Sequence, residues 1–69
     1  MFYYIRGELV LIDSGFCVID AGGVGYKLTI TSRTSENLTR DPSKRRDVTL
    51  YTHFAVREDA VELFGFLTL

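Results

Sequence analysis

The feature that most constrains the fold lies near the C-terminal end, where two apolar runs are separated by three consecutive charged residues. In the first run, Val48–Val56, apolar residues recur at every second position, which is the period of a β-strand. Arg57, Glu58 and Asp59 end this pattern, and a second apolar run, Val61–Leu67, follows. We therefore expect two strands joined by a charged connection whose carboxylates lie in solvent, because burying unpaired charge is costly.

Strand alternation divides the first of these strands into two faces. The face expected to lie inside the fold carries Val48, Leu50, Phe54 and Val56, with Thr52 among them. His53 is the only histidine of the chain, and it points to the opposite side. With no second ligand nearby, a structural or interface role is favoured over metal binding, and no metal or other cofactor is expected.

Composition places the chain among small folded domains. A chain of 69 residues forms one domain at most, and such a domain buries only about 60% of the surface that its unfolded form exposes. Hydrophobic residues make up 46%, and four tyrosines and five phenylalanines accompany a single proline, which predicts a folded rather than a disordered chain. The net charge of −1 gives no global indication of nucleic-acid binding.

Cys17 is the only cysteine, which excludes an internal disulfide and favours a reducing, cytoplasmic setting. It lies between two apolar residues and has no neighbouring base in the sequence. A buried structural thiol is therefore expected rather than a nucleophile. No apolar run approaches the roughly 20 residues of a membrane span, and no signal-peptide pattern is present.

Three further strands are expected in the first half of the chain. The first is Phe2–Ile12, interrupted at Gly7, and a glycine inside a strand indicates a bulge or a sharp bend such as a barrel corner. A turn at residues 13–15 leads to the second strand, Phe16–Asp20. A glycine-rich turn over residues 21–25 precedes the third strand. The apolar face of that third strand carries Tyr26, Leu28 and Ile30.

The glycine-rich run Gly22-Gly23-Val24-Gly25-Tyr26 could be mistaken for a phosphate-binding loop. It lacks the Lys-Ser/Thr ending of such loops, and no helix follows it that a phosphate could cap. A tight turn is the favoured interpretation, because glycine takes positive φ values without steric cost. Gly22, Gly23 and Gly25 are therefore predicted to be structural.

Between the third and fourth strands the alternating pattern stops. Residues 34–38 are compatible with one short helical turn, with Ser32 or Thr34 as its N-cap. Residues 40–47 are polar, contain the only proline and are predicted to form an exposed loop. A basic cluster, Lys44–Arg46, lies in this loop, and it is either a solvated loop or a patch that contacts phosphates.

Five short strands in so small a domain must close on themselves or leave exposed edges. The economical solution is an all-β, five-stranded Greek-key barrel of the OB type, with a short helix between the third and fourth strands. An SH3-like barrel is the alternative. The bend expected at Gly7 and the position of the helical segment favour the OB-fold.

Three stretches occur in the order and spacing of one family: Arg6-Gly7, GGVGY at residues 22–26, and THFAVREDAVELFGF at residues 52–66. Through them, and over nearly its whole length, the chain resembles the N-terminal domain of the RuvA family, the Holliday junction-binding subunits of the bacterial branch-migration complex. The resemblance implies an OB-fold, in agreement with the strand pattern. It also implies that residues 1–69 are the first domain alone, without the family's helix-hairpin-helix and ATPase-binding domains, and the abrupt apolar end fits such a fragment.

The functional expectations follow from this resemblance. It implies a role in recombination, DNA repair and the SOS response, as a homotetramer on a four-way DNA junction with RuvB as the partner ATPase. The domain itself is then not an enzyme. Glu58 and Asp59 match the family's acidic pins at the junction centre, where repulsion of phosphates helps to separate strands. Candidates for contact with the DNA backbone are Lys44, Arg45, Arg46 and Arg57.

Two other functions stay open at this point. One is a purely structural oligomerisation domain whose charged turn is only solvated. The other is a general single-strand-binding OB domain, which needs exposed aromatic residues interleaved with basic residues on one face. Tyr26 with Lys27, and Tyr51 with His53, come closest to that pattern.

Overall fold

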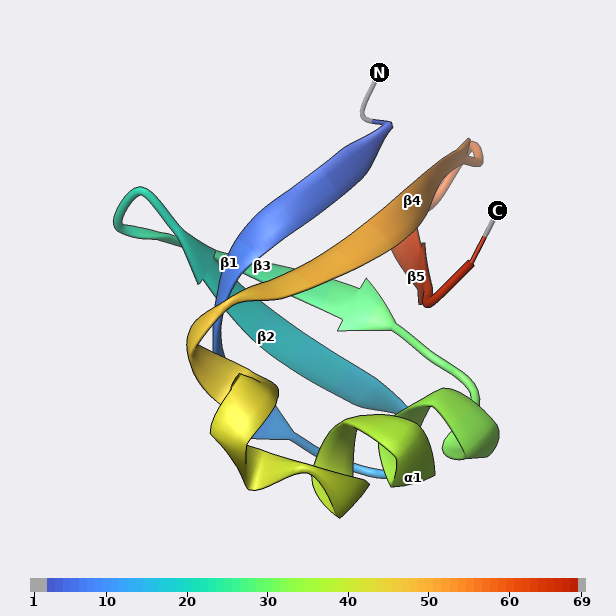
Figure 1. The fold of residues 1–69 in the computed structure, drawn as a ribbon. Helices are drawn as coiled ribbons and strands as arrows, with labels where there is room; N and C mark the ends of the chain where they lie inside the picture. Colours follow the sequence, from blue (N-terminus) through green and yellow to red (C-terminus); the bar gives the residue numbers. More distant parts are fainter. Residues whose placement is uncertain (1–2, 69) are drawn as a thin grey trace.

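The computed structural model describes residues 3–68, and these form a closed five-stranded barrel with two short helices between its third and fourth strands (Figure 1). The elements are β1 (Tyr4–Ile12), β2 (Phe16–Ala21), β3 (Val24–Thr29), α1 (Ser32–Arg40), the 3-10 helix η1 (Pro42–Arg46), β4 (Val48–Val56) and β5 (Val61–Phe66). The expected strands are confirmed to within a few residues at their ends. Phe2, the expected start of the first strand, lies outside the described residues.

The strand order around the barrel is β1-β2-β3-β5-β4, and β4 closes the circle by pairing with β1. All neighbours are antiparallel except β3 and β5, which are parallel. This order, with a helix between β3 and β4, is consistent with an OB-fold and confirms the expected fold class.

Gly7 is the point at which β1 changes its partner. Residues Tyr4–Gly7 pair with β4, whereas the stretch that begins at Glu8 pairs with β2. At this crossing the backbone of β1 passes so close to β2 that a Cβ atom on Gly7 would lie 2.2 Å from the carbonyl oxygen of Asp20. The expected barrel corner at Gly7 is thus confirmed, and its cause is a backbone approach that only glycine permits.

The core lies inside the barrel and is built from inward-facing residues of β1 to β4 and the start of the β3–α1 connection. Its buried members are Ile5, Leu9, Cys17, Ile19, Leu28, Ile30, Val48 and Leu50. Cys17 is fully buried, as expected of a structural thiol. Burial raises the pKa of its thiol to about 11, so the thiolate needed for nucleophilic attack is scarce at neutral pH.

The turn between β2 and β3 is tighter than predicted. Only Gly22 and Gly23 lie outside the strands, with φ values of 64° and 90° that suit glycine. The carboxylate of Asp20 accepts a hydrogen bond from the N–H of Gly23 at 2.9 Å. Gly25, predicted to lie in the turn, belongs instead to β3, where it pairs with Asp20. The turn role is therefore confirmed for Gly22 and Gly23 and wrong for Gly25.

Helix α1 is longer than the single turn expected, and its N-cap is Thr31 rather than Ser32 or Thr34. The hydroxyl of Thr31 accepts a hydrogen bond from the N–H of Thr34 at 3.2 Å. Ser35 is buried, and its hydroxyl donates to the carbonyl oxygen of Asp13 at 2.8 Å. Packing against the β1–β2 turn thus stabilises a helix whose polar sequence gave little indication of its length.

The predicted loop at residues 40–47 is largely helical. Pro42 opens η1, where its fixed φ is favourable and its missing N–H would be unpaired in any case. Asp41 precedes it, and its carboxylate accepts hydrogen bonds from the backbone N–H and the hydroxyl of Ser43.

Within residues 3–68, no helix has the length and apolar character needed to cross a membrane.

Candidate nucleic-acid interface

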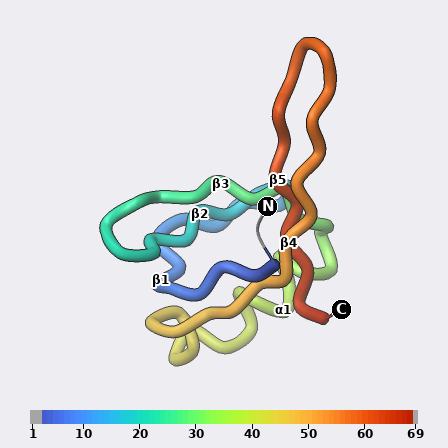
Figure 2. Tube along the Cα trace, turned by 90° about the horizontal axis from the view of Figure 1, so that it is seen from above, coloured from blue at the N-terminus to red at the C-terminus, as the bar shows by residue number. Residues whose placement is uncertain are grey.

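The hairpin of β4 and β5 extends beyond the barrel as a narrow projection (Figure 2). Its pairing continues without a break from Tyr51 and Phe66 at the barrel to Val56 and Val61 near its end. We call residues 54–63 the hairpin arm. Val56 and Val61 are 67% and 62% exposed, so the outer part of the arm stands clear of the core.

The expectation for the inner face of β4 holds only for the half of the strand that belongs to the barrel. Val48 and Leu50 are buried, whereas Phe54 is half-buried at the base of the arm. The prediction that Val56 lies inside is wrong. The physical reason is that β4 continues past the barrel wall, so its apolar face no longer meets an opposite wall.

The tip of the arm consists of Arg57, Glu58, Asp59 and Ala60, all of which are exposed. The N–H of Arg57 donates to the carbonyl oxygen of Ala60 at 2.7 Å, which leaves Glu58 and Asp59 as the two central residues of a tight turn. Among the described residues, neither carboxylate forms an ion pair. The arm therefore carries two adjacent negative charges at its end, held by a regular ladder of backbone pairs.

The basic cluster lies on η1, at the end of the molecule opposite to the hairpin tip (Figures 1 and 2). The structure therefore does not bring Lys44, Arg45 and Arg46 together with Glu58 and Asp59. Arg57 is the one predicted backbone-contact residue that lies beside the acids. The sequence-predicted residues thus form two separate sites, an acidic tip and a basic helix end.

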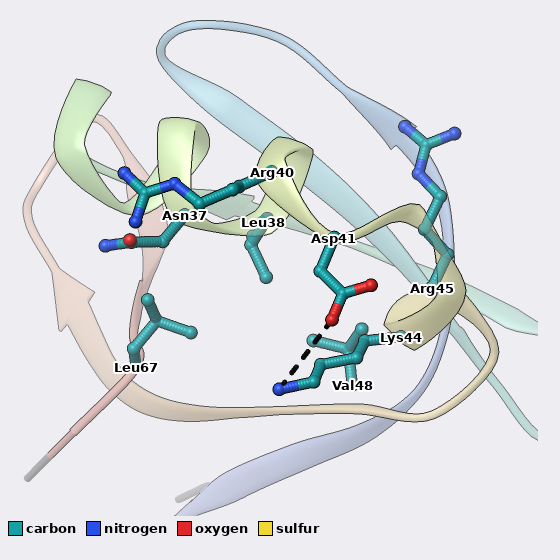
Figure 3. Close-up of a pocket in the computed structure, with 8 residues that line it drawn as sticks. All are labelled: Asn37, Leu38, Arg40, Asp41, Lys44, Arg45, Val48 and Leu67. Carbon is teal, nitrogen blue, oxygen red and sulfur yellow. Dashed lines mark ion pairs between the residues drawn. The ribbon is translucent and has the colours of Figure 1, made fainter.

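A hollow of about 420 Å³ borders the basic cluster (Figure 3). Its lining combines Leu38, Val48 and Leu67 with Asn37, Arg40, Asp41, Lys44 and Arg45. Lys44 turns toward Asp41, and their charged atoms are 4.0 Å apart, whereas Arg45 turns away from the hollow. Asp41 thus offsets part of the positive charge that the sequence places here, which weakens the cluster as a phosphate site.

An ion pair that sequence reasoning missed joins β1 to the residue before β4. The guanidinium of Arg6 donates to both carboxylate oxygens of Asp47, at 2.8 Å from Nε and 3.0 Å from Nη2. This hydrogen bonding, more than charge attraction alone, lowers the pKa of Asp47 and raises that of Arg6. The two residues are 41 positions apart, so no local pattern indicates their pairing.

The Asp47 carboxyl should titrate below its ordinary pKa of 3.8 in the intact domain, and the Arg6→Gln variant should return it toward that value. Because the folded-state pKa is lowered, the pair stabilises the fold at neutral pH and loses this effect as pH falls through that pKa. Carboxyl ¹³C chemical shifts followed by NMR provide the measurement. Asp41, whose pKa is lowered mainly by Ser43, serves as the internal control and should not change. An unchanged Asp47 titration in the variant would contradict the pairing.

Aromatic rings gather where β1 meets β4, where Tyr3 and Tyr4 are exposed and Tyr51 is half-buried. Tyr3 contacts the rings of Tyr4 and Tyr51 edge to face, with centroids 6.0 and 5.7 Å apart. On the hairpin of β4 and β5, the centroid of the His53 ring lies 6.3 Å from that of the Phe64 ring.

Within the described part of the chain, no group of three or more His, Cys, Asp or Glu residues could hold a metal ion.

The sequence is similar to one family of known proteins. Residues 1–65 match the RuvA N terminal domain family. The chain is 48% identical over 67 residues to the Holliday junction branch migration complex subunit RuvA of Chlorobaculum tepidum, which covers 97% of this chain and 32% of that protein. It is 44% identical over 68 residues to the protein of the same name from Symbiobacterium thermophilum, covering 99% of this chain and 32% of that protein.

A relative of the same name from Xanthomonas campestris is 46% identical over 63 residues, with 91% of this chain and 31% of that protein covered. The chain spans about a third of the length of the curated relatives it matches. The family match extends from the first strand into β5, and it includes the whole hairpin arm. The barrel, the projecting arm and these matches together establish that the chain belongs to the RuvA N-terminal domain family.

Proposed function

We propose that this domain acts in the branch migration of Holliday junctions, where it places Glu58 and Asp59 at the point at which the DNA strands cross. The observation that carries the proposal is the hairpin arm, which holds two carboxylates away from the barrel, neither of them in an ion pair with another described residue. The names of the relatives, which are subunits of a Holliday junction branch migration complex, support the choice of DNA substrate.

The proposed mechanism is electrostatic. The carboxylates repel the phosphates of the DNA backbone, and in salt of about 0.15 M such an effect reaches roughly 8 Å. An acidic tip at a crossover therefore disfavours strand paths that pass directly over it, and it directs each strand into an outgoing duplex. Several copies around one junction would act together. We propose a homotetramer, with the partner ATPase RuvB supplying the energy, so that this domain carries no catalysis itself.

The basic residues have a smaller part in this proposal. Lys44 is paired with Asp41, and Arg6 is paired with Asp47, so only part of the positive charge around η1 is offset, and Arg45 and Arg46 form no ion pair within the described residues. Affinity for DNA scales with the number of phosphates that are neutralised. We therefore expect the 69-residue chain alone to bind DNA with a dissociation constant of about 10⁻⁴ M or weaker at physiological salt.

The double variant Glu58→Gln, Asp59→Asn tests the role of the tip. It should be made in a chimera in which this chain replaces the matching 67 residues of the Chlorobaculum tepidum relative. Removing two charges that face phosphates should tighten binding to junctions and to plain duplex, by about fivefold or less for each charge. Discrimination between junction and duplex should fall, and branch migration should slow. Fluorescence anisotropy with labelled DNAs at low salt measures the affinities.

The matched control is the variant Glu8→Gln, Glu36→Gln, which removes two exposed acids from β1 and α1 instead. It changes the net charge equally but should leave discrimination unaltered. If the tip variant binds both DNAs with unchanged affinity, the acids are only a solvated turn. A structural oligomerisation domain would then be the better description, and the cluster formed by the exposed Tyr3 and Tyr4 with the half-buried Tyr51 would be its first candidate surface.

A further inference from the structure

The attachment of the hairpin arm to the barrel is narrow on the side of β3. There, β5 is joined to β3 through one parallel residue pair, Thr29 with Phe64. Between this point and the tip, β5 has backbone partners only on β4, its own hairpin partner, among the described residues. The hairpin ladder makes the arm straight, but it does not fix the angle at which the arm leaves the barrel.

One side-chain hydrogen bond crosses this junction beyond the backbone pair. The hydroxyl of Thr29 donates to Oε2 of Glu62 at 2.8 Å, and both side chains are partly buried. Glu62 lies two residues nearer the tip than Phe64, so the bond holds the arm at a second point. It is the only hydrogen bond to the Glu62 carboxylate from the described residues. A bond to an ionised acceptor is about twice as strong as a neutral one.

Leu63, at the base of the arm, packs against the core, but toward the tip the arm borders open space on the side of β3. A hollow of about 400 Å³ lies between β3 and the arm, and its lining comprises Lys27, Thr29, Phe54, Ala60, Val61, Glu62 and Leu63. The ammonium of Lys27 lies over the ring of Phe16, 4.8 Å from its centroid, and forms no ion pair with Glu62. The Thr29–Glu62 bond is thus the polar contact best placed to hold the arm against the barrel.

We infer that Thr29 and Glu62 are positioning residues, whose hydrogen bond sets the angle of the hairpin arm and thereby the location of Glu58 and Asp59. The geometric part of this inference is independent of DNA. Its consequence for junction binding rests on the proposed function, because only a tip held in one place can occupy the centre of a crossover.

The test compares variants that break the bond with variants that keep it. Thr29→Val and Glu62→Ala remove the donor and the acceptor, whereas Thr29→Ser keeps the hydroxyl and Glu62→Gln keeps an acceptor oxygen without the charge. The measurement is the backbone ¹⁵N order parameter of residues 57–61 in the 69-residue chain. Breaking the bond should lower it from about 0.85, the value of rigid backbone, to below about 0.6. The conservative variants should retain the higher value.

Barrel amides provide the internal reference, and their order parameters should not change in any of the four variants. Glu8→Ala, which removes an exposed acid of β1, should leave the tip rigid. If Thr29→Val does not fold, the pair Glu62→Ala and Glu62→Gln makes the same comparison from the acceptor side. A tip that stays rigid in Glu62→Ala would overturn the inference.

The same variants in the chimera separate this inference from the proposed function. Loosening of the tip with a loss of junction discrimination supports both. If Glu62→Ala loosens the tip while the double variant Glu58→Gln, Asp59→Asn leaves DNA binding unchanged, the positioning role stands and the proposed function is wrong. If the tip keeps its order in Glu62→Ala while the neutral tip alters DNA binding, the proposed function stands and the positioning role is wrong.

Discussion

Replacing Gly7 with alanine is expected to lower the free energy of unfolding by about 3 kcal/mol or more, at the upper end of the cost of overpacking. The added Cβ atom would meet backbone on the facing strand, 2.2 Å from the carbonyl oxygen of Asp20 and 2.9 Å from its carbonyl carbon. Backbone atoms cannot rotate away as a side chain can, so β1 or β2 must shift. Such a loss corresponds to a fall in Tm of roughly 12 to 24 °C for a domain of this size.

Gly15→Ala is the matched control. No atom lies within 4 Å of a Cβ atom built on Gly15, and its φ is not positive. The substitution should therefore be neutral or stabilise the domain by about 0.4 to 1 kcal/mol, because alanine restricts the unfolded chain. Thermal unfolding followed by circular dichroism measures both variants. In so small a domain, a loss of 1 kcal/mol lowers the Tm by about 4 °C or more. If the Tm of Gly7→Ala lies within about 2 °C of the parent's, β1 and β2 therefore do not cross as closely as described.

Leu50→Ala has the second largest expected effect, a loss of about 2 to 5 kcal/mol. Leu50 is fully buried at the centre of the barrel, and its side chain lies against Gly65 of β5. Truncation leaves a cavity that the closed barrel can fill only by moving several strands. A small domain is stable by only about 5 to 15 kcal/mol, so this variant should be partly unfolded well below the parent's Tm.

The loss of stability in Leu50→Ala can be compared with the losses at two further positions on the same strand. Phe54→Ala should cost less than Leu50→Ala, because Phe54 is only half-buried at the base of the hairpin arm. Val56→Ala should change stability by no more than about 0.5 kcal/mol, since its side chain is 67% exposed. Urea denaturation gives the three values under one condition. Equal costs at positions 50 and 56 would show that β4 lies within the barrel over its whole length.

Much of the fold could be predicted from the sequence because two rules act locally. Period-two alternation identified the strands, and the turn residues separated them. Gly7 was informative because a glycine weakens an apolar strand, so its presence there indicates a bend or a close backbone approach. The register of β1 against β2 shifts two residues later, between Leu9 and Leu11, so the bend and the irregular pairing lie at the same corner.

The errors concern where elements end rather than whether they exist. Alternation continues along β4 whether or not a barrel wall faces it, so the sequence predicted Val56 to be buried although it is exposed. Helix α1 was underestimated because five of its nine residues are Ser, Thr or Asn, which favour helices less, and contacts such as the bond from Ser35 to Asp13 stabilise it. Tertiary packing, which a local pattern does not contain, decides both cases.

In the candidate site, too, local patterns predicted some features, whereas others depend on tertiary contacts. The positions of Glu58 and Asp59 at the tip followed from three consecutive charges between two strands. The Arg6–Asp47 pair and the Thr29–Glu62 bond join residues 41 and 33 positions apart, and neither pair stands out by composition. Such contacts become visible only once the strand order is known, because β5 inserts between β3 and β4.

The exposure of the hairpin arm also bears on how this family can diverge. Substitutions at exposed positions usually change stability by no more than about 0.5 kcal/mol, so the acids at the tip are nearly free of selection for folding. We therefore expect the barrel to tolerate altered charge at the tip without a loss of foldability. We therefore expect selection at positions 57–60 to act mainly on what the tip encounters, and selection at Gly7 or Leu50 to act on whether the domain folds.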